Sequence, residues 1–519
     1  MRPSAMSEVS LEFVIKHAGK TYPIKLSENA KGSDLKNEVV SLTNVPIERQ
    51  KYMVKGGKLN DDVLVSTLIK PKQTVMLLGT PDAGLIHAPA KKQKFLEDKY
   101  QPEDLHNTSK EHANPNIPLG LKNLGNTCYA NSTLQAIYQI DPIREAVLAL
   151  DPSTNASNPE DEPHLKLIKE LKLVFREMRD KKQPQVFPGT FIMQLRQVYP
   201  NFKEIDQATS IYKQQDAEEM FTLLMNSLRI VFPKVMDCST IEFLTKITDL
   251  NNPSDVSYKN DDVDTKLQCH ISSSTNFLKN GLQNSLTETL EKNSSITNTN
   301  STFEYSKKIT RLPEYLTVQY VRFFWKKSSG KKSKILRKVT FPFQLDVADL
   351  LEPEYAAKKI DTREKLRDVD RRKQEEEREL RKQKQTPNSS NTSLDVPSGM
   401  TQEEFDAMDP MELEVLKKSL EESRKEKWAA EFKSEFPENL SGGENASCLY
   451  NLVAIITHKG ANSESGHYQS FIKDTDNDEV WYKYNDDQVS TLSKEKVELL
   501  AGGGESDSAL ILIYKAFGL

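Results

Sequence analysis

The chain has 519 residues, of which 37% are hydrophobic and 28% are charged. Its 71 basic and 76 acidic residues give a net charge of -5, so the composition gives no reason to expect nucleic acid or a membrane surface as a partner. No apolar run approaches the roughly 18 residues that a membrane span needs, and the start MRPSAMSEVS lacks the apolar core of a secretory signal. We therefore expect a soluble intracellular protein of about two to four domains, in the cytosol, the nucleus or both.

Residues 9–80 have the pattern of a small α+β domain. LEFVIKHAGKTYPIKL alternates apolar and polar residues on both sides of a turn at residues 17–20, which predicts a hairpin. Ser33 is the expected N-cap of a helix, and Pro46 should end that helix. QKYMVKGGKL and TVMLLG predict two more strands, the first ending in the Gly-Gly pair at residues 56–57.

In element order this segment resembles the β-grasp fold of ubiquitin, with an unrelated small α+β domain as the alternative. Ubiquitin ends in a free Gly-Gly tail, whereas this segment continues into LLGTPDAG. The resemblance therefore implies a docking module and not a conjugated tag. Residues 81–116 are rich in proline, lysine and polar residues without periodicity, which predicts a linker.

A long globular pattern covers residues 117–519, with one interruption at about 352–440. Between residues 361 and 385, 18 of 25 residues are charged, with both signs mixed. Mixed charge without an apolar stripe predicts a solvated helix or disorder, not core. Strand-like patterns on both sides, KVTFPFQLDV and CLYNLVAIITH, indicate an insertion within one domain.

Cys128 is the first candidate for chemistry. Gly120 and Gly125 mark a turn before it, while Leu134 and Ile137 fit one helical face after it. Cys128 should therefore lie in or near the first turn of a helix, where the dipole and the free N–H groups favour the thiolate. A thiolate there suits nucleophilic catalysis, although a lone cysteine is more often a small buried hydrophobic residue.

A thiolate nucleophile needs a base and a residue that orients the base. His467 lies in the polar loop NSESGH before an alternating strand, and the turn with Asn485 and Asp486 follows the next strand-like pattern, WYKY. Two adjacent antiparallel strands would bring His467 to this turn, and one imidazole nitrogen would then face Cys128. His270 is a competitor, but it lacks a nearby glycine and an acidic turn, so we expect a structural role for it.

Four separated segments closely resemble the ubiquitin-specific protease family: the cysteine box GLKNLGNTCYANSTLQ, the second box YKQQDAEEMFTLL, the inner strand LTVQYVRFFW, and the histidine box GHYQSFIKD, WYKYNDDQVS and ALILIYK. The resemblance covers residues 117–519 except for the insertion. It implies an α+β protein in which the ubiquitin-like β-grasp precedes a papain-like cysteine protease domain with a thumb, a palm and β-rich fingers.

The resemblance also implies catalytic roles at the matching positions. Cys128 would be the nucleophile and His467 the general base. Asn485 would orient His467. Asp486 would point to the other side if the strand alternation continues, but it could still assist catalysis by polarising a water or the oxyanion site. Asn123 would line the oxyanion hole, where an amide donor stabilises the tetrahedral intermediate.

Two acidic residues of the second box match positions that hold the basic C-terminal tail of ubiquitin. Asp216 and Glu219 lie three apart, on one helical face, and would bind through charge-assisted hydrogen bonds. A solvated helix face is the alternative interpretation. Many family members also hold zinc with two CxxC pairs, but residues 238–340 contain only Cys238, Cys269 and His270 as candidate ligands. We predict no metal and no cofactor, and fingers held by strand pairing and apolar packing.

The predicted activity is a cysteine isopeptidase that removes ubiquitin from conjugates by attack on the carbonyl of ubiquitin's C-terminal glycine. A ubiquitin-like domain ahead of such a protease resembles the proteasome-associated member of the family in its fungal form. That resemblance implies docking on the base of the proteasome regulatory particle, with a cytoplasmic and nuclear location. A catalytically silent, ubiquitin-binding proteasome adaptor is the main alternative, and a general peptidase is a third.

The charged stretch contains one weaker signal. Leu416, Ser419, Ser423 and Glu426 have a spacing similar to that of ubiquitin-interacting helices, but Ser419 stands where alanine is expected. A solvated helix without a partner is the competing interpretation of the same residues.

Overall fold

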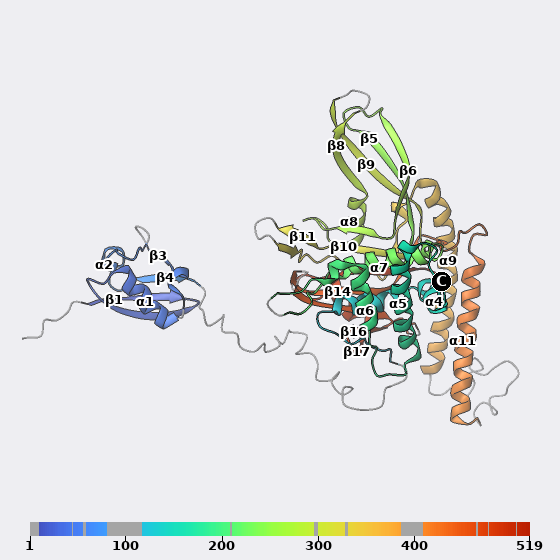
Figure 1. Ribbon diagram of the computed structural model, residues 1–519, viewed down its shortest axis with the longest axis horizontal. Helices are drawn as coiled ribbons and strands as arrows, with labels where there is room; N and C mark the ends of the chain where they lie inside the picture. Colours follow the sequence, from blue (N-terminus) through green and yellow to red (C-terminus); the bar gives the residue numbers. More distant parts are fainter. Residues whose placement is uncertain are drawn as a thin grey trace, which may run out of the picture. The chain divides into compact units, whose positions relative to one another are not determined.

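The computed structural model describes residues 10–43, 45–54, 59–79, 117–207, 210–294, 299–326, 331–385, 408–462, 465–475, 477–504 and 506–519. The chain divides into two compact units, Met1–His112 and Ala113–Leu519 (Figure 1). The predicted linker at 81–116 and the Gly-Gly pair at 56–57 lie outside the described residues. Within the described ranges, no helix combines the length and apolar character that crossing a membrane requires.

The N-terminal unit is a four-stranded sheet with order β2-β1-β4-β3, covered by one helix. As predicted, β1 and β2 form a hairpin; its turn residues Ala18 and Gly19 have φ of 47° and 78°, which suits a tight two-residue turn. The elements are β1 Ser10–His17, β2 Lys20–Ser27, α1 Gly32–Thr43, η1 Ile47–Arg49, β3 Lys51–Met53, α2 Val65–Leu68 and β4 Thr74–Leu78.

The start of α1 differs from the prediction. The helix begins at Gly32, so Ser33 lies inside it and is not the N-cap. The carboxylate of Asp34 accepts a hydrogen bond from the backbone N–H of Lys31 at 2.8 Å. The acidic side chain of Asp34 thus binds a backbone donor just before the helix, and it also complements the helix dipole.

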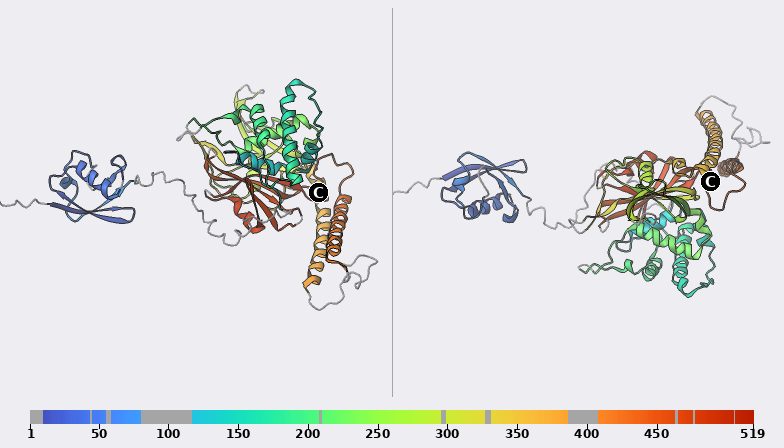
Figure 2. Two further views of the ribbon diagram at one scale, coloured as in Figure 1. Left: turned by 60° about the horizontal axis from the view of Figure 1, so that its bottom comes forward. Right: turned by 90° about the horizontal axis from the view of Figure 1, so that it is seen from above.

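A layer of helices packs on one face of the large sheet of the second unit (Figures 1 and 2). The shared core joins apolar residues of the helices to sheet residues such as Ala454, Tyr468 and Ile511. The helices are α3 Cys128–Ile137, α4 Asp141–Ala149, η5 Pro159–Asp161, α5 Glu162–Asp180, α6 Gly189–Val198, η6 Pro200–Lys203, α7 Ala217–Val231 and η7 Val235–Ser239.

The large sheet has the order β17-β16-β15-β14-β18-β10-β7, with β13 paired to β14. A second apolar core covers its other face and includes Trp481, Leu512 and Tyr514. The elements are β7 Leu267–His270, α8 Leu278–Ser285, β10 Tyr315–Val321, β13 Gln344–Asp346, η8 Ala348–Leu350, β14 Leu449–Asn462, β15 Ser465–Lys473, β16 Val480–Asn485, β17 Gln488–Ser493, α12 Lys494–Glu498, η9 Leu499–Ala501 and β18 Ser508–Ala516.

A separate sheet with order β6-β5-β9-β8 projects from this body and forms the fingers (Figure 1). Its strands are β5 Ile241–Asp249, β6 Val256–Asp264, β8 Thr287–Asn293 and β9 Asn300–Arg311, and a short hairpin pairs β11 Phe323–Lys326 with β12 Lys331–Lys334. Cys238 and Cys269 are buried in two different apolar cores. In the described part of the chain, no three His, Cys, Asp or Glu side chains are grouped as metal ligands would be.

The charged stretch forms two long helices that lie side by side, α9 Pro353–Gln385 and α11 Pro410–Ser434 (Figures 1 and 2). The expectation that no part of this stretch belongs to the core is wrong where the two helices approach the large sheet. Leu366 and Val369 of α9 and Trp428 and Phe432 of α11 are buried in one cluster, to which β14 contributes Leu449. These few apolar residues lie three and four apart on their helices, so they build a contact that the dense surrounding charge hides in the sequence pattern.

Candidate active site

The turn before Cys128 is built from short polar contacts. Gly125 and Asn126 have φ of 93° and 55°, and the Oδ1 of Asn123 accepts hydrogen bonds from the backbone N–H groups of Gly125 at 2.9 Å and Thr127 at 3.3 Å. The turn ends where α3 begins, at Cys128 itself. This is the helix start that the sequence predicted, and it places the thiol beside the free N–H groups of the first turn.

The acidity of this thiol differs from the expectation. Cys128 is 2% exposed, and burial raises its pKa to about 11. The backbone N–H of Tyr468 lowers the pKa, while the carboxylate of Asp486 raises it further. In the free protein, desolvation of the thiolate therefore outweighs the helix start, which sequence reasoning took as decisive.

His467 and Asn485 come together on two adjacent strands. β15 pairs antiparallel with β16, and the Nε2 of His467 lies 2.6 Å from the Oδ1 of Asn485. Since an amide oxygen only accepts, Nε2 carries the proton in this contact, and Nδ1 is left with a lone pair. Among the described residues, no hydrogen bond joins His467 to Cys128, although the Tyr468 contact places the thiol next to this segment of β15.

Strand alternation predicted that Asp486 would point away from the site, but its side chain points into the site. Its φ is 56°, and it lies in the turn between β16 and β17, where the alternation has ended. Its carboxylate accepts hydrogen bonds from the Nδ2 of Asn123 at 2.9 Å and from the Nδ2 of Asn131 at 2.8 Å, and it lies 3.9 Å from the Nε2 of His467. A β-carbon on Gly120 would lie 2.6 Å from the Asp486 carbonyl oxygen, so the close approach requires glycine there.

Asn131 is a residue to which sequence reasoning gave no role. It is 2% exposed, and its Nδ2 also donates to the carbonyl of Leu121 at 3.2 Å. The signal was present in the spacing, because Asn131 is a polar residue one helical turn after Cys128 in a helix whose ten residues are all buried. A buried amide at that position requires a polar partner, and Asp486 provides it.

Of the two acidic residues of the second box, one precedes α7 and the other lies in its first turn. Asp216 is the N-cap of α7, where its carboxylate accepts a hydrogen bond from the backbone N–H of Glu218 at 3.0 Å. Glu219 lies in the first turn and accepts from the Nδ2 of Asn201 at 2.6 Å. Pattern reasoning extended the helix one residue too far, because aspartate also favours the N-cap.

The remaining polar candidate, His270, lies away from these residues. It is exposed at the end of β7, at the opposite edge of the sheet from β16, and its Nε2 lies 3.2 Å from the Oε1 of Gln268. Its surroundings give no sign of the structural role that we expected.

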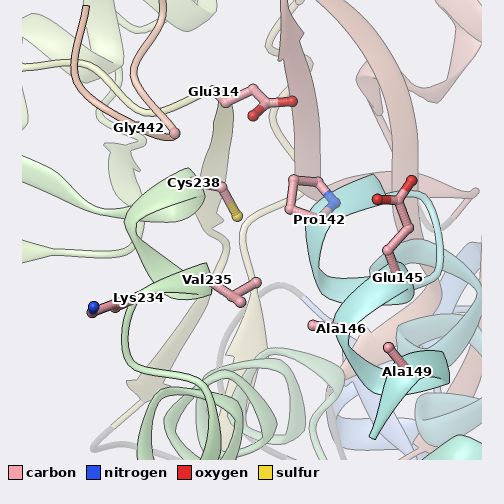
Figure 3. Close-up of a pocket in the computed structure, with 10 residues that line it drawn as sticks. Pro142, Glu145, Ala146, Ala149, Lys234, Val235, Cys238, Glu314 and Gly442 are labelled. Carbon is pink, nitrogen blue, oxygen red and sulfur yellow. The ribbon is translucent and has the colours of Figure 1, made fainter.

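A cavity of about 490 Å³ is lined by α4, η7, Glu314 and the glycines at 442 and 443 (Figure 3). None of the predicted catalytic residues lines it. Burial raises the pKa of Cys238, on its wall, to about 12, and no histidine is among the residues that line this cavity, so they offer no imidazole base for the thiol.

The raised pKa of Cys128 gives a direct prediction for the free protein. Only the thiolate reacts with iodoacetamide, so alkylation of Cys128 should accelerate by about tenfold per pH unit from pH 7 towards pH 10. Peptide mass spectrometry after short exposures measures the rate at each cysteine. Cys238, Cys269 and Cys448, whose pKa values burial raises to about 12, should react more slowly. An alkylation rate of Cys128 that does not rise between pH 7 and pH 10 would contradict the prediction.

Comparisons with known proteins agree with this arrangement. A family model described as "Ubiquitin carboxyl-terminal hydrolase" matches residues 119–514, and one described as "Ubiquitin family" matches residues 13–82. Ubiquitin carboxyl-terminal hydrolase 6 of Schizosaccharomyces pombe is 34% identical over 98% of this chain and 99% of its own length. Ubiquitin carboxyl-terminal hydrolase 7 of Arabidopsis thaliana is 34% identical over 93% of each chain, and ubiquitin carboxyl-terminal hydrolase 14 of Caenorhabditis elegans is 28% identical over 97% of this chain and 92% of its own. The predicted α+β fold class, a ubiquitin-like unit followed by a protease unit of this family, is thereby confirmed.

Proposed function

The chain belongs to the ubiquitin carboxyl-terminal hydrolase family and is a thiol-dependent, ubiquitin-specific cysteine protease, and from this we propose that it is a proteasome-associated deubiquitinase in which Cys128 is the nucleophile. Its partners are ubiquitin and ubiquitinated proteins. One observation carries the assignment of the site. The start of α3, β15 and the turn after β16 converge. Asn485 is hydrogen-bonded to His467, and Asp486 accepts a hydrogen bond from Asn123.

The reaction follows from these contacts. Once ubiquitin is bound, Nδ1 of His467 accepts the proton of the Cys128 thiol, and the sulfur attacks the carbonyl carbon of ubiquitin's C-terminal glycine. The Nδ2 of Asn123 and the backbone N–H at Cys128 stabilise the negative oxygen that forms. The carbon–nitrogen bond to the substrate lysine breaks as His467 returns the proton to the departing amine. Water then hydrolyses the thioester, again with His467 as base, and releases ubiquitin.

A ubiquitin active-site probe tests this function. Ubiquitin vinyl sulfone should label Cys128, and the enzyme should cleave a ubiquitin fusion while leaving an unfolded protein intact. Labelling at another cysteine, or comparable cleavage of the unfolded protein, would contradict the assigned nucleophile or the ubiquitin specificity, respectively.

We assign proteasome docking to the ubiquitin-like unit, residues 9–80, with 81–116 as the linker and the protease domain at 117–519, interrupted at about 352–440. Three large apolar side chains support a docking face. Met53, Met76 and Leu78 are 62%, 46% and 49% exposed, and the register places Met53 opposite Met76 across β3 and β4. Their neighbours in β4, Val75 and Leu77, are buried on the opposite, α1 side, so the three form one face of the sheet. Association with the proteasome would locate the enzyme in the cytoplasm and the nucleus.

A single substitution tests this docking face. Met76→Asp places a charge at its centre and should reduce co-purification with the proteasome at least about tenfold, because a carboxylate is costly to bury in an apolar contact. Labelling by a ubiquitin probe should be unchanged. Leu42→Asp is the matched control, since Leu42 is 40% exposed on α1 and off this face. If Met76→Asp and Leu42→Asp co-purify equally with proteasome, the docking face is wrong.

A further inference from the structure

The sequence specifies the start of α11 strongly. Asp409 is the N-cap, with its Oδ1 accepting a hydrogen bond from the backbone N–H of Met411 at 2.9 Å, and Pro410 occupies the first helical position. These are two of the strongest helix-start signals, and together they fix a helix far from the apolar base at Trp428 and Phe432. A helical conformation is therefore encoded where the domain core does not require one.

Two ion pairs between the long helices set their register. Arg372 of α9 pairs with Glu431 of α11 at 2.9 Å, and Glu376 pairs with Lys427 at 2.8 Å. Each step along α9 therefore corresponds to one step back along α11, so Gln385, where α9 ends, falls opposite Lys418. The first two turns of α11 extend beyond the end of α9.

These two turns carry an exposed apolar face. Met411 is 76% exposed, the highest value for a large hydrophobic side chain among the described residues, and Val415 is 69% exposed. Ser419 continues the row four residues later, and the exposed Lys418, Glu422 and Glu426 lie on the same side of the helix. Leu416, which the sequence placed on the binding face, is half-buried, so the exposed row lies one residue out of register with the expected one.

The occupant of this face is indicated by chemistry found elsewhere in the chain. The ubiquitin-like unit shows what such a fold offers on β3 and β4: Met53, Met76 and Leu78. Lysines border that face, since Lys51 is the register partner of Leu78 and Lys16 that of Met76. An apolar helix row complements an apolar sheet face, and Glu422 and Glu426 beyond this row complement the lysines that border the sheet face. Ubiquitin has this fold and is the enzyme's substrate.

We propose that the first turns of α11, through Met411 and Val415, bind a second ubiquitin outside the active site. This rests on the proposed function only in that the ligand is the enzyme's own substrate. In a conjugate that carries several ubiquitins, one would occupy α11 while another enters the site at Cys128. The contact is small, and it acts by raising the effective concentration of the conjugate near the active site.

The test measures binding of ubiquitin to α11 while the active site at Cys128 is occupied by another ubiquitin. Full-length enzyme is reacted to completion with ubiquitin propargylamide, so that Cys128 and its cleft are occupied. ¹⁵N-labelled ubiquitin is then titrated with this adduct and followed by NMR. Chemical-shift changes should appear on the face of the labelled ubiquitin that corresponds to β3 and β4 of the ubiquitin-like unit. Val415→Asp should weaken binding at least about tenfold. Leu499→Asp is the matched control, because Leu499 is also 69% exposed but lies in η9.

Each outcome bears on one proposal. Binding that Val415→Asp weakens and Leu499→Asp does not supports the α11 site. No binding to the adduct, or binding that neither or both substitutions weaken, overturns it. Formation of the adduct itself reports on Cys128, so failure of the proposed nucleophile would appear as absence of the covalent product, before any titration.

Discussion

Cys128→Ala is expected to lower the turnover of a fluorogenic ubiquitin substrate by about 10⁴-fold or more, because it removes the group that forms the thioester. Ubiquitin binding and the fold should persist. Alanine has the highest helix propensity, so α3 keeps its first residue, and the change removes a single buried atom. Steady-state hydrolysis measured with proteasome present gives the loss, and binding of ubiquitin to the variant shows that the cleft is intact.

Cys448→Ala is the matched control for this substitution. Cys448 is also fully buried, but it lies in the core on the other face of the sheet. Its loss should leave turnover near that of the wild type. Residual activity of Cys128→Ala at a similar level would exclude Cys128 as the nucleophile.

Asp486→Ala is expected to lower kcat by about 10²- to 10³-fold, with little change in ubiquitin affinity. The carboxylate holds Asn123 through one oxygen and Asn131 through the other. Without it, the amide of Asn123 is no longer fixed where the oxyanion forms, and the buried amide of Asn131 loses a partner, at a cost to stability of about 1–3 kcal/mol. Asp486→Asn retains an accepting oxygen for one of the two amides, so its kcat should lie between those of the wild type and Asp486→Ala.

Asn485 variants measured beside Asp486→Ala separate the two roles. Asn485→Ala should lower kcat, because His467 loses the contact that orients it, whereas Asn485→Asp should retain activity, because a carboxylate also accepts from Nε2. Turnover of Asp486→Ala within about threefold of the wild type would show that the Asn123 contact is not catalytic. Normal turnover of Asn485→Ala together with a collapse of Asp486→Ala would assign the orienting role to Asp486 instead.

Local patterns determined what could be predicted of this site. The helix start at Cys128 follows from short-range spacing and lies where the sequence placed it. His467, which the sequence placed in the loop before a strand, lies inside β15. The direction of Asp486 depends on a positive φ in the residue after β16, which alternation along a strand cannot reveal. The raised pKa of Cys128 arises from burial by distant segments, so the sequence favoured the opposite direction.

The same limit explains the errors outside the site. Asp216 looked like the first member of a helical face, but its role as N-cap depends on where α7 begins, and helix boundaries are the least certain part of a pattern. In the charged stretch, Leu366 and Val369 lie within a segment in which 18 of 25 residues are charged, and this charge hides the short apolar contact. Their packing became evident only when α9 and α11 were seen to lie side by side.

The strand order of the large sheet has a consequence for the enzyme's own synthesis. β18 follows the other strands of this sheet in the chain but lies between β14 and β10, and Asp486 is bound to Asn123 across 363 residues of chain. A nascent chain that has been translated only as far as β14 therefore holds the thiol of Cys128 without His467 or the residue that orients it. Before translation ends, the half-made sheet lacks one of its central strands. We therefore expect the protease to stay inert towards ubiquitin until β15, β16 and β18 have been translated and have joined the sheet.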